Sequence, residues 1–194
     1  MRSLVTHVKN ILSPEECREI IDDQIPWLSP GLTGGGKKTT KEWRKSDVAF
    51  IPNNHPHLRK YISRIHKVIV DIARTVHQTE ITAFEHAQFT RYKSFGFYKP
   101  HNDVQIVAPM RTISATIELS NPQDYIGGGI TIYSTTTKGV KQPKEQGTLI
   151  TFPSLALHEA NTVYWGTRYS LVIWGFARHP NETDPALDKW KRKK

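Results

Sequence analysis

The sequence contains a single cysteine, no long apolar run and no internal repeat. With one cysteine, Cys17, the chain cannot form an internal disulfide, which excludes a fold held together by such bonds. No stretch approaches the roughly 18 apolar residues that a membrane span needs, and the first residues lack the apolar core of a secretory signal. We therefore expect a cytoplasmic protein with no membrane association, in a reducing compartment, and Cys17 as a small, partly buried residue of the first helix and not a nucleophile.

Positive charge exceeds negative charge, with 27 Lys and Arg residues against 18 Asp and Glu residues and a formal net charge of +9. Part of this excess lies in a basic tail, residues 178–194, which ends in Lys-Trp-Lys-Arg-Lys-Lys. Such a field attracts acidic partners, including nucleic acid. A solvated terminal segment is the usual explanation of such a charge run, so nucleic acid is a partner that we do not favour.

Two amphipathic helices are predicted in the first half of the chain, after a short strand within residues 1–12. Ser13 is a typical N-cap, Pro14 suits the first helical position, and Glu16 completes a capping box for a helix that ends near Ile25. A second helix is predicted from His57 to about Val76. Its apolar positions recur every three or four residues: Leu58, Ile62, Ile65, Ile69, Ile72 and Val76.

Residues 26–46 form a predicted loop that is too long to be a simple connection, which is typical of a lid or a binding segment. Within it, Gly31 to Lys37 has the spacing of a phosphate-binding loop as far as its lysine. The next residue is Lys38 instead of Ser or Thr, and Pro30 precedes the segment in place of a strand. We therefore reject nucleotide binding and predict a glycine-rich lid.

From residue 82 onward, short β-branched and aromatic runs alternate with Gly, Pro and Asn turns. The predicted strands are Ala87–Tyr92, Phe97–Gln105, Thr112–Leu119, Ile130–Tyr133, Gly147–Phe152, Val163–Trp165 and Tyr169–Ala177, with a tight turn at Gly127–Gly129. This pattern favours a mainly β protein with flanking α-helices and a double-sheet jelly-roll core. We expect one domain over residues 1–194, with helical support and the lid in 1–80 and the core in 84–177.

His101, Asp103 and His158 are the residues most informative about function. Two imidazoles and a carboxylate can hold Fe(II) on one face of an octahedron and leave the other face open. Residues 101 and 103 of an extended strand point to the same side, so one strand supplies two ligands. The third, His158, follows an apolar run, residues 147–153, that predicts a neighbouring strand. Arg168 opens a further strand, where a guanidinium suits bidentate capture of a carboxylate.

These residues, in this order, resemble the 2-oxoglutarate- and Fe(II)-dependent dioxygenases, and among them the prolyl 4-hydroxylase-like group. The resemblance covers about residues 84–177, and the segments Leu12–Ile21 and Gly166–Ser170 also fit it. It implies a double-stranded β-helix, an Fe(II) ion held by His101, Asp103 and His158, and a 2-oxoglutarate cosubstrate whose distal carboxylate pairs with Arg168. The arginine at this position resembles the pattern of the oxygen-sensing and the bacterial or viral branches, whereas collagen-type members usually have lysine there.

The same resemblance implies an oxidative reaction with O2, in which 2-oxoglutarate is converted to succinate and CO2 and an unactivated C–H bond is hydroxylated. Ascorbate is an optional reductant for such enzymes. Further cosubstrate contacts are expected from Tyr92, Thr112, Ser170 or Ser114, and core packing is the alternative for Tyr92. For three aromatic residues the sequence leaves the choice open between core packing and the wall of the pocket: Tyr98, Trp165 and Trp174. Contact with a peptide substrate is left open for Arg91 and Trp43.

The expected substrate is a prolyl residue in a peptide or protein, followed by another amino-acid or protein substrate and then by nucleic acid. Two alternatives from other classes stay open, namely a noncatalytic jelly-roll binding module and a cupin-like metalloenzyme that does not use 2-oxoglutarate. The sequence does not determine the oligomeric state.

Overall fold

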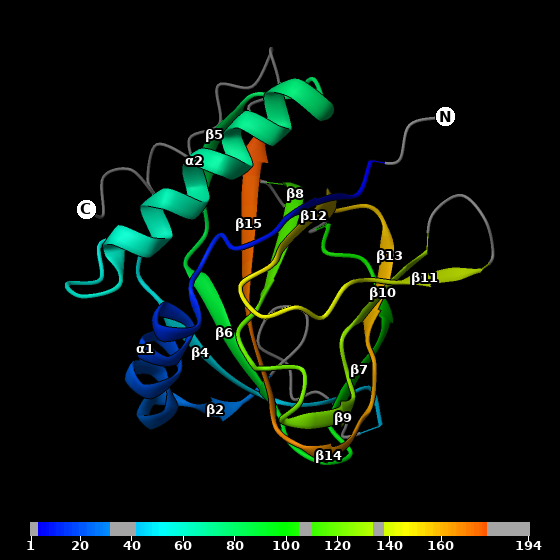
Figure 1. The fold of residues 1–194 in the computed structure, drawn as a ribbon. Helices are drawn as coiled ribbons and strands as arrows, with labels where there is room; N and C mark the ends of the chain where they lie inside the picture. The colour runs from blue at the N-terminus through cyan, green and yellow to red at the C-terminus, as the bar shows by residue number, and fades with distance from the viewer. Residues whose placement is uncertain (1–3, 32–41, 105–109, 134–137, 178–194) are drawn as a thin grey trace.

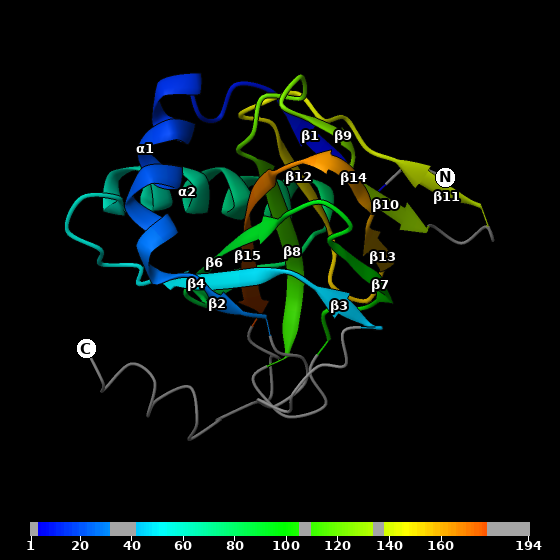
Figure 2. The same cartoon turned by 90° about the horizontal axis from the view of Figure 1, so that it is seen from below.

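The strands form two antiparallel sheets that face each other, which confirms the predicted jelly roll (Figures 1 and 2). This computed structural model describes residues 4–31, 42–104, 110–133 and 138–177, so the glycine-rich segment 32–41 and the basic tail 178–194 lie outside the described residues. The larger sheet has the order β1 (Thr6–Val8), β12 (Leu149–Pro153), β8 (Arg111–Glu118), β15 (Arg168–Ala177), β6 (Ala87–Tyr92), β4 (Asp47–Ile51) and β2 (Ser29–Pro30), with β5 (Ile81–Phe84) paired to β15.

The smaller sheet carries two of the predicted metal ligands. Its order is β11 (Gly139–Lys141), β10 (Ile130–Tyr133), β13 (Leu157–Ala160), β7 (Phe97–His101) and β3 (Arg44–Lys45). A two-stranded ribbon of β9 (Tyr125–Gly127) and β14 (Val163–Gly166) lies at one end of the sheets, as Figure 1 shows. Its turn into β10 has positive φ at Gly127, Gly128 and Gly129, which glycine adopts at little cost, and this confirms the predicted tight turn.

Two helices cover the outer face of the larger sheet, opposite the smaller sheet (Figure 2). Helix α1 (Pro14–Gln24) begins with the predicted capping box between Ser13 and Glu16, and a 3-10 turn, η1 (Ile25–Trp27), follows it. Helix α2 (Arg59–Val76) turns Ile62, Ile65 and Ile69 toward the core, where all three are fully buried. The predicted helices are therefore confirmed, with ends within two residues of those observed.

Alternation along β8 explains how one strand serves both the core and the site. Ile113, Ala115 and Ile117 belong to the apolar core beneath the helices. The alternate positions Ser114, Thr116 and Glu118 face the other way, toward the smaller sheet, and they are equally buried. An apolar face packs against the helices because burial of apolar surface drives folding, whereas a row of buried polar groups requires hydrogen-bonding partners. The space between the sheets is therefore where chemistry is expected.

Several strands have ends that differ from the predictions, and several were missed. Strands β6 and β10 match the predicted bounds, whereas β7 ends at His101 and Asp103 follows it outside any strand. The expectation that His158 follows a strand next to the His101 strand was wrong in detail. His158 lies within its own strand, β13, which pairs with β7, while the preceding run forms β12 in the other sheet. The long loop 26–46 contains β2 and β3, and β4 follows it.

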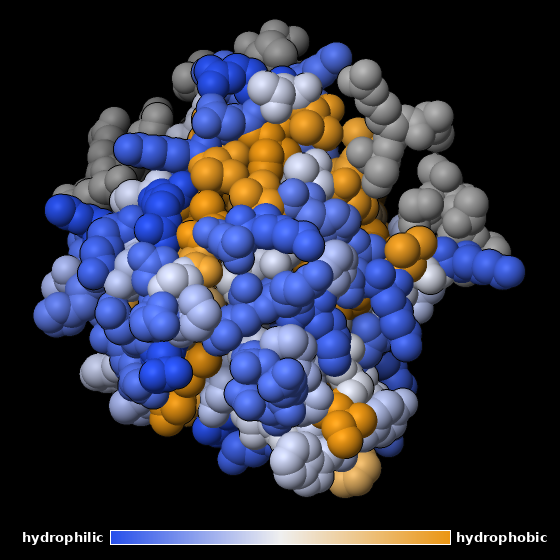
Figure 3. All heavy atoms as spheres, in the orientation of Figure 1, coloured by the Kyte–Doolittle hydropathy of each residue, from blue (hydrophilic) through white to orange (hydrophobic). Residues whose placement is uncertain are grey.

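The surface seen in Figure 3 is largely hydrophilic, with a hydrophobic band in its upper half.

A cavity of about 450 Å³ lies beside the end of α2 and is lined in part by Leu4, Val76 and Ile113. Among the described residues, no helix is both long enough and apolar enough to cross a membrane.

Candidate active site

His101, Asp103 and His158 converge between the two sheets, although Asp103 and His158 are 55 positions apart in the sequence. One ligand atom from each lies within 4.8 Å of the others. The Asp103 carboxylate is 3.8 Å from Nε2 of His101 and 3.4 Å from Nε2 of His158. Strands β7 and β13 bring the two imidazoles together, because His101 and His158 are direct partners in their register. Within the described residues this is the one such cluster of potential metal ligands.

Both imidazoles have their Nε2 atoms turned toward the cluster. Nδ1 of His101 donates a hydrogen bond to the Lys99 carbonyl at 2.8 Å, and Nδ1 of His158 donates to the Ala156 carbonyl at 2.9 Å. A carbonyl oxygen accepts only, so each Nδ1 carries a proton, and in the neutral form of the ring the lone pair is then on Nε2. Backbone bonds of this kind fix the tautomer and the ring orientation that a metal ligand needs.

The Asp103 carboxylate is held by neighbours that are not ligands. The hydroxyl of Ser114 donates to Asp103 Oδ2 at 2.7 Å and lies 2.9 Å from the hydroxyl of Ser154. The backbone N–H of Asp103 donates to the Ser154 carbonyl at 2.9 Å. The carboxylate therefore has a fixed direction even though Asp103 lies beyond the end of β7. The sequence suggested Ser114 as a cosubstrate contact, whereas here its hydroxyl orients the metal ligand.

Charge in the cluster favours metal binding. Burial and, to a smaller extent, the nearby His158 together lower the pKa of His101 to about 4 against the opposing effect of Asp103, so the imidazole is neutral at neutral pH. Burial acts to raise the pKa of Asp103, but the adjacent imidazoles and the Ser114 hydroxyl hold it below its ordinary value. Neutral imidazoles and an ionised carboxylate are the forms that bind a metal cation.

Arg168, the predicted anchor for a carboxylate, is 2% exposed at the start of β15. Its guanidinium already has a partner, because Nε donates to Glu118 Oε2 at 2.8 Å and Nη2 donates to Glu118 Oε1. The Glu118 side chain is completely buried. Burial acts to lower the pKa of Arg168, but the charge of Glu118 outweighs it and raises the pKa above its ordinary value. Glu118 was not among the residues predicted from the sequence, because nothing local marks a glutamate in a strand as the partner of a residue 50 positions away.

The other predicted cosubstrate residues are divided between two places. Tyr92 is opposite Arg168 in the β6–β15 register, with the guanidinium 5.4 Å from its ring centroid. Ser170 is 2% exposed and is opposite Glu118. Thr112 lies near the other end of β8, where its hydroxyl accepts a hydrogen bond from Ala177 N–H at 3.1 Å. Tyr92 and Ser170 are thus brought to Arg168, and Thr112 is not.

Three of the residues with open alternatives now have assigned contacts. The ring of Tyr98 stacks on His101 with centroids 3.6 Å apart, and the guanidinium of Arg111 lies 3.6 Å from the Trp174 ring centroid. Arg91 forms a hydrogen-bonded ion pair with Asp47. In contrast, Trp165 and Trp43 are exposed at the surface. Tyr98 therefore belongs to the wall of the metal cluster.

A family model described as the 2OG-Fe(II) oxygenase superfamily matches residues 87–176, which span β6 to β15 and contain the whole cluster. The matched residues include all three ligands of the cluster and Arg168. The chain is a 2-oxoglutarate- and Fe(II)-dependent oxygenase with an intact His-x-Asp…His iron-binding triad.

Within that class, similar proteins include a PKHD-type hydroxylase of Acinetobacter baumannii (strain AYE), which is 26% identical over 185 residues, covering 88% of this chain and 77% of the relative. A prolyl hydroxylase from Trichoplax adhaerens, solved in complex with a hypoxia inducible factor oxygen degradation domain peptide fragment, has a TM-score of 0.75 at 20% identity and covers 89% of this chain and 83% of its own. A Pseudomonas putida prolyl-4-hydroxylase has a TM-score of 0.73 at 17% identity, with 91% and 94% covered. The two structures establish the fold.

Proposed function

We propose that this oxygenase hydroxylates an unactivated C–H bond of a prolyl residue in a peptide or protein. The observation that supports it most is the convergence of His101, Asp103 and His158 within 4.8 Å, with both Nε2 atoms available. The PKHD-type relative is a hydroxylase by name, and the Trichoplax enzyme is a prolyl hydroxylase solved with a peptide. These names support a peptide substrate.

The donor set fits the group that the family implies. His101, Asp103 and His158 would hold Fe(II), because two neutral imidazoles and a carboxylate on one face are the ligands typical of non-haem Fe(II) oxygenases. Bound iron supplies the activation of O2 and the oxidation of 2-oxoglutarate. Arg168, with Tyr92 and Ser170 beside it, would bind the distal carboxylate of 2-oxoglutarate.

The remaining task of the chain is positioning and exclusion of water. The Ser114 hydroxyl keeps the Asp103 carboxylate directed at the metal, and the carbonyls of Lys99 and Ala156 keep the two imidazoles in place. Tyr98 covers one face of His101, and Phe152 lies against His158 with ring centroids 4.7 Å apart. These apolar surfaces lower the access of water to the cluster.

A screen of prolyl-containing peptides tests the proposal. The protein, Fe(II) and 2-oxoglutarate should give a peptide whose mass increases by one oxygen atom, and the added oxygen should be on proline. The Asp103→Ala variant should give no such product. Oxygen on another residue or only on an oligonucleotide would replace the prolyl assignment. No iron-dependent succinate formation under any condition would favour a noncatalytic module. Failure of N-oxalylglycine to stabilise the metal-loaded protein would favour a metalloenzyme that does not use 2-oxoglutarate.

A further inference from the structure

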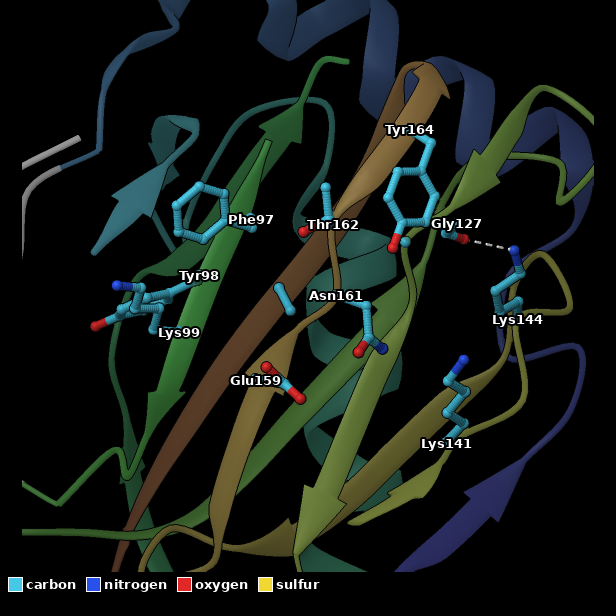
Figure 4. Close-up of a pocket in the computed structure, with 12 residues that line it drawn as sticks. Phe97, Tyr98, Lys99, Gly127, Lys141, Lys144, Glu159, Asn161, Thr162 and Tyr164 are labelled. Atoms are coloured by element: carbon cyan, nitrogen blue, oxygen red, sulfur yellow. Dashed lines mark hydrogen bonds between the residues drawn. The ribbon is translucent and has the colours of Figure 1, made fainter. Parts of the chain in front are cut away.

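A groove of about 650 Å³ lies on the outer face of the smaller sheet, opposite the face that carries His158 (Figure 4). It is separate from the metal cluster, because neither His101, Asp103 nor His158 lines it. Alternation along β13 explains this, since Glu159 follows His158 and faces the other side of the sheet. The volume is within the range of about 300–1,000 Å³ that is typical of ligand sites.

Lysine side chains dominate the charge of the groove. The described residues that line it include three lysines, Lys99, Lys141 and Lys144, and one acidic residue, Glu159. The Glu159 carboxylate already accepts a hydrogen bond from the Tyr133 hydroxyl at 2.5 Å. The groove therefore carries net positive charge and attracts an anionic ligand.

Lys141 and Lys144 form no ion pair with any described residue. The Lys144 ammonium donates to the Gly127 carbonyl at 2.8 Å, which uses one of its three donors. Burial lowers the pKa of Lys144 the most, and the like charge of Lys141 acts in the same direction. A carboxylate between these two ammonium groups would reduce their repulsion and accept hydrogen bonds from both.

The charges of the groove alternate in sign across the sheet, which bears on the kind of anion. Thr131 of β10 is opposite Lys141 on one side and opposite Glu159 on the other. Strand β7, with Lys99, lies beyond Glu159. Because neighbouring strands are about 4.8 Å apart, the Glu159 position is roughly 10 Å from that of Lys141.

This alternation favours a peptide over a nucleic acid. A nucleic acid carries a phosphate at every nucleotide, so a strand that followed the groove would bring a phosphate against Glu159. A peptide can place acidic residues at the lysines and an uncharged residue at Glu159. The groove thus matches a peptide segment that is rich in acidic residues without being uniformly charged.

Exposed aromatic side chains at the groove offer apolar contacts to such a peptide. Tyr164 is 63% exposed and is directed into the groove (Figure 4). Trp43 is 44% exposed, and the Lys99 ammonium group is 5.8 Å from its ring centroid. Aromatic residues are enriched in protein interfaces and often act as anchors there. Aromatic rings beside ammonium groups suit a peptide that combines acidic and apolar side chains.

We propose that this groove binds an acidic segment of the protein substrate, separate from the residue that is presented to the iron. The inference rests on the proposed function, because it assigns the segment to the same substrate chain. The groove and the metal cluster lie on opposite faces of the smaller sheet, so two parts of that chain are bound at once. Attachment at the groove raises the effective concentration of the reactive segment at the active site.

Fluorescence anisotropy with a fluorescein-labelled hexaglutamate peptide and the metal-free protein tests the groove without turnover. Lys141→Gln/Lys144→Gln should weaken binding about tenfold, the effect of two surface charge contacts. Lys141→Glu, at an exposed position, should weaken it at least as much and leaves the Lys144 contacts in place. Lys60→Gln/Lys67→Gln removes the same charge from α2, outside the larger sheet, and should weaken binding less than about twofold.

Equal losses in the groove variants and in the α2 variant would overturn the inference, because the net charge and not the groove would then bind the peptide. An oligothymidylate that binds more tightly than hexaglutamate, with its binding lost in Lys141→Glu, would overturn it in favour of nucleic acid.

Hydroxylation of two matched prolyl peptides tests whether the groove serves the substrate. One peptide carries a glutamate-rich extension on a flexible linker, and the other carries glutamine in its place. The acidic peptide should have a KM about tenfold lower in the unmodified protein, and the ratio should approach one in Lys141→Glu. Equal KM values in the unmodified protein would overturn the assignment to the substrate. If neither peptide is hydroxylated while hexaglutamate binding depends on Lys141, the prolyl assignment fails and the acidic peptide site is supported.

Discussion

Replacing Arg168 by alanine should destabilise the protein as well as weaken cosubstrate binding. The Arg168 and Glu118 side chains are 3% and 0% exposed, and two hydrogen bonds join them. In Arg168→Ala the carboxylate of Glu118 remains buried without its cation. Loss of one partner of a buried ion pair costs about 3–5 kcal/mol, because the remaining charge has neither water nor a counter-charge.

This cost is large relative to the free energy of unfolding of a typical protein, about 5–15 kcal/mol. For a chain of this size each kcal/mol lowers the thermal midpoint by about 2–4 °C, so the variant should unfold roughly 10 °C earlier. The double variant Glu118→Leu/Arg168→Met removes both charges and keeps much of the volume. It should recover most of the loss, since apolar replacement of a whole buried pair is often neutral.

Urea unfolding followed by circular dichroism at pH 7 measures these free energies for the unmodified protein, Arg168→Ala and the double variant. A loss below about 1 kcal/mol in Arg168→Ala would refute the argument, because it would mean that the buried carboxylate does not depend on the guanidinium. A double variant as unstable as Arg168→Ala would refute it as well. The cosubstrate affinities of these variants must be compared at a temperature well below their thermal midpoints.

Three further outcomes follow from the geometry. Ser114→Ala should weaken Mn(II) binding about tenfold in a chelator competition, since it removes the bond that orients Asp103, and an unchanged affinity would exclude that role. Gly128→Ala should lower the thermal midpoint, because φ is 58° and the added Cβ would contact Tyr125 at 2.8 Å, and an unchanged midpoint would contradict the packing. Burial lowers the pKa of His66 to about 4, below that of the unfolded chain, so its contribution is complete above about pH 6.5 and decreases as the pH falls toward 4. Between pH 7 and 5 the unmodified protein should lose at most about 2 kcal/mol more than His66→Phe in urea unfolding, and equal losses would contradict the assignment.

The sequence predicted the features that short-range patterns encode. The capping box at Ser13, the apolar period of α2 and strands β6 and β10 were found because the periods of 3.6 and 2 are local properties. The triad was found because its residue types and order are distinctive. Strand β13 was missed because it has only four residues, follows a turn that contains proline, and lacks a sustained alternation of buried and exposed positions.

Pairings between distant side chains could not be predicted in the same way. Glu118 looks like any polar residue of a strand, and only the β8–β15 register brings it to Arg168. Similarly, Thr112 and Ser114 are equivalent in sequence terms, yet one bonds Ala177 and the other bonds Asp103. Because residues two positions apart on a strand share a face, the position along β8 decides which of these hydroxyls reaches the site.

Anaerobic Fe(II) titration of the unmodified protein and of Asp103→Ala tests the central claim most directly, because the account depends on three side chains that bind the same ion. We expect saturable binding at one site per chain in the unmodified protein and loss of that binding in Asp103→Ala, with the unfolding midpoint of the metal-free variant showing that it remains folded. Equal Fe(II) affinity in the two proteins, or no saturable binding in the unmodified protein, would contradict the account.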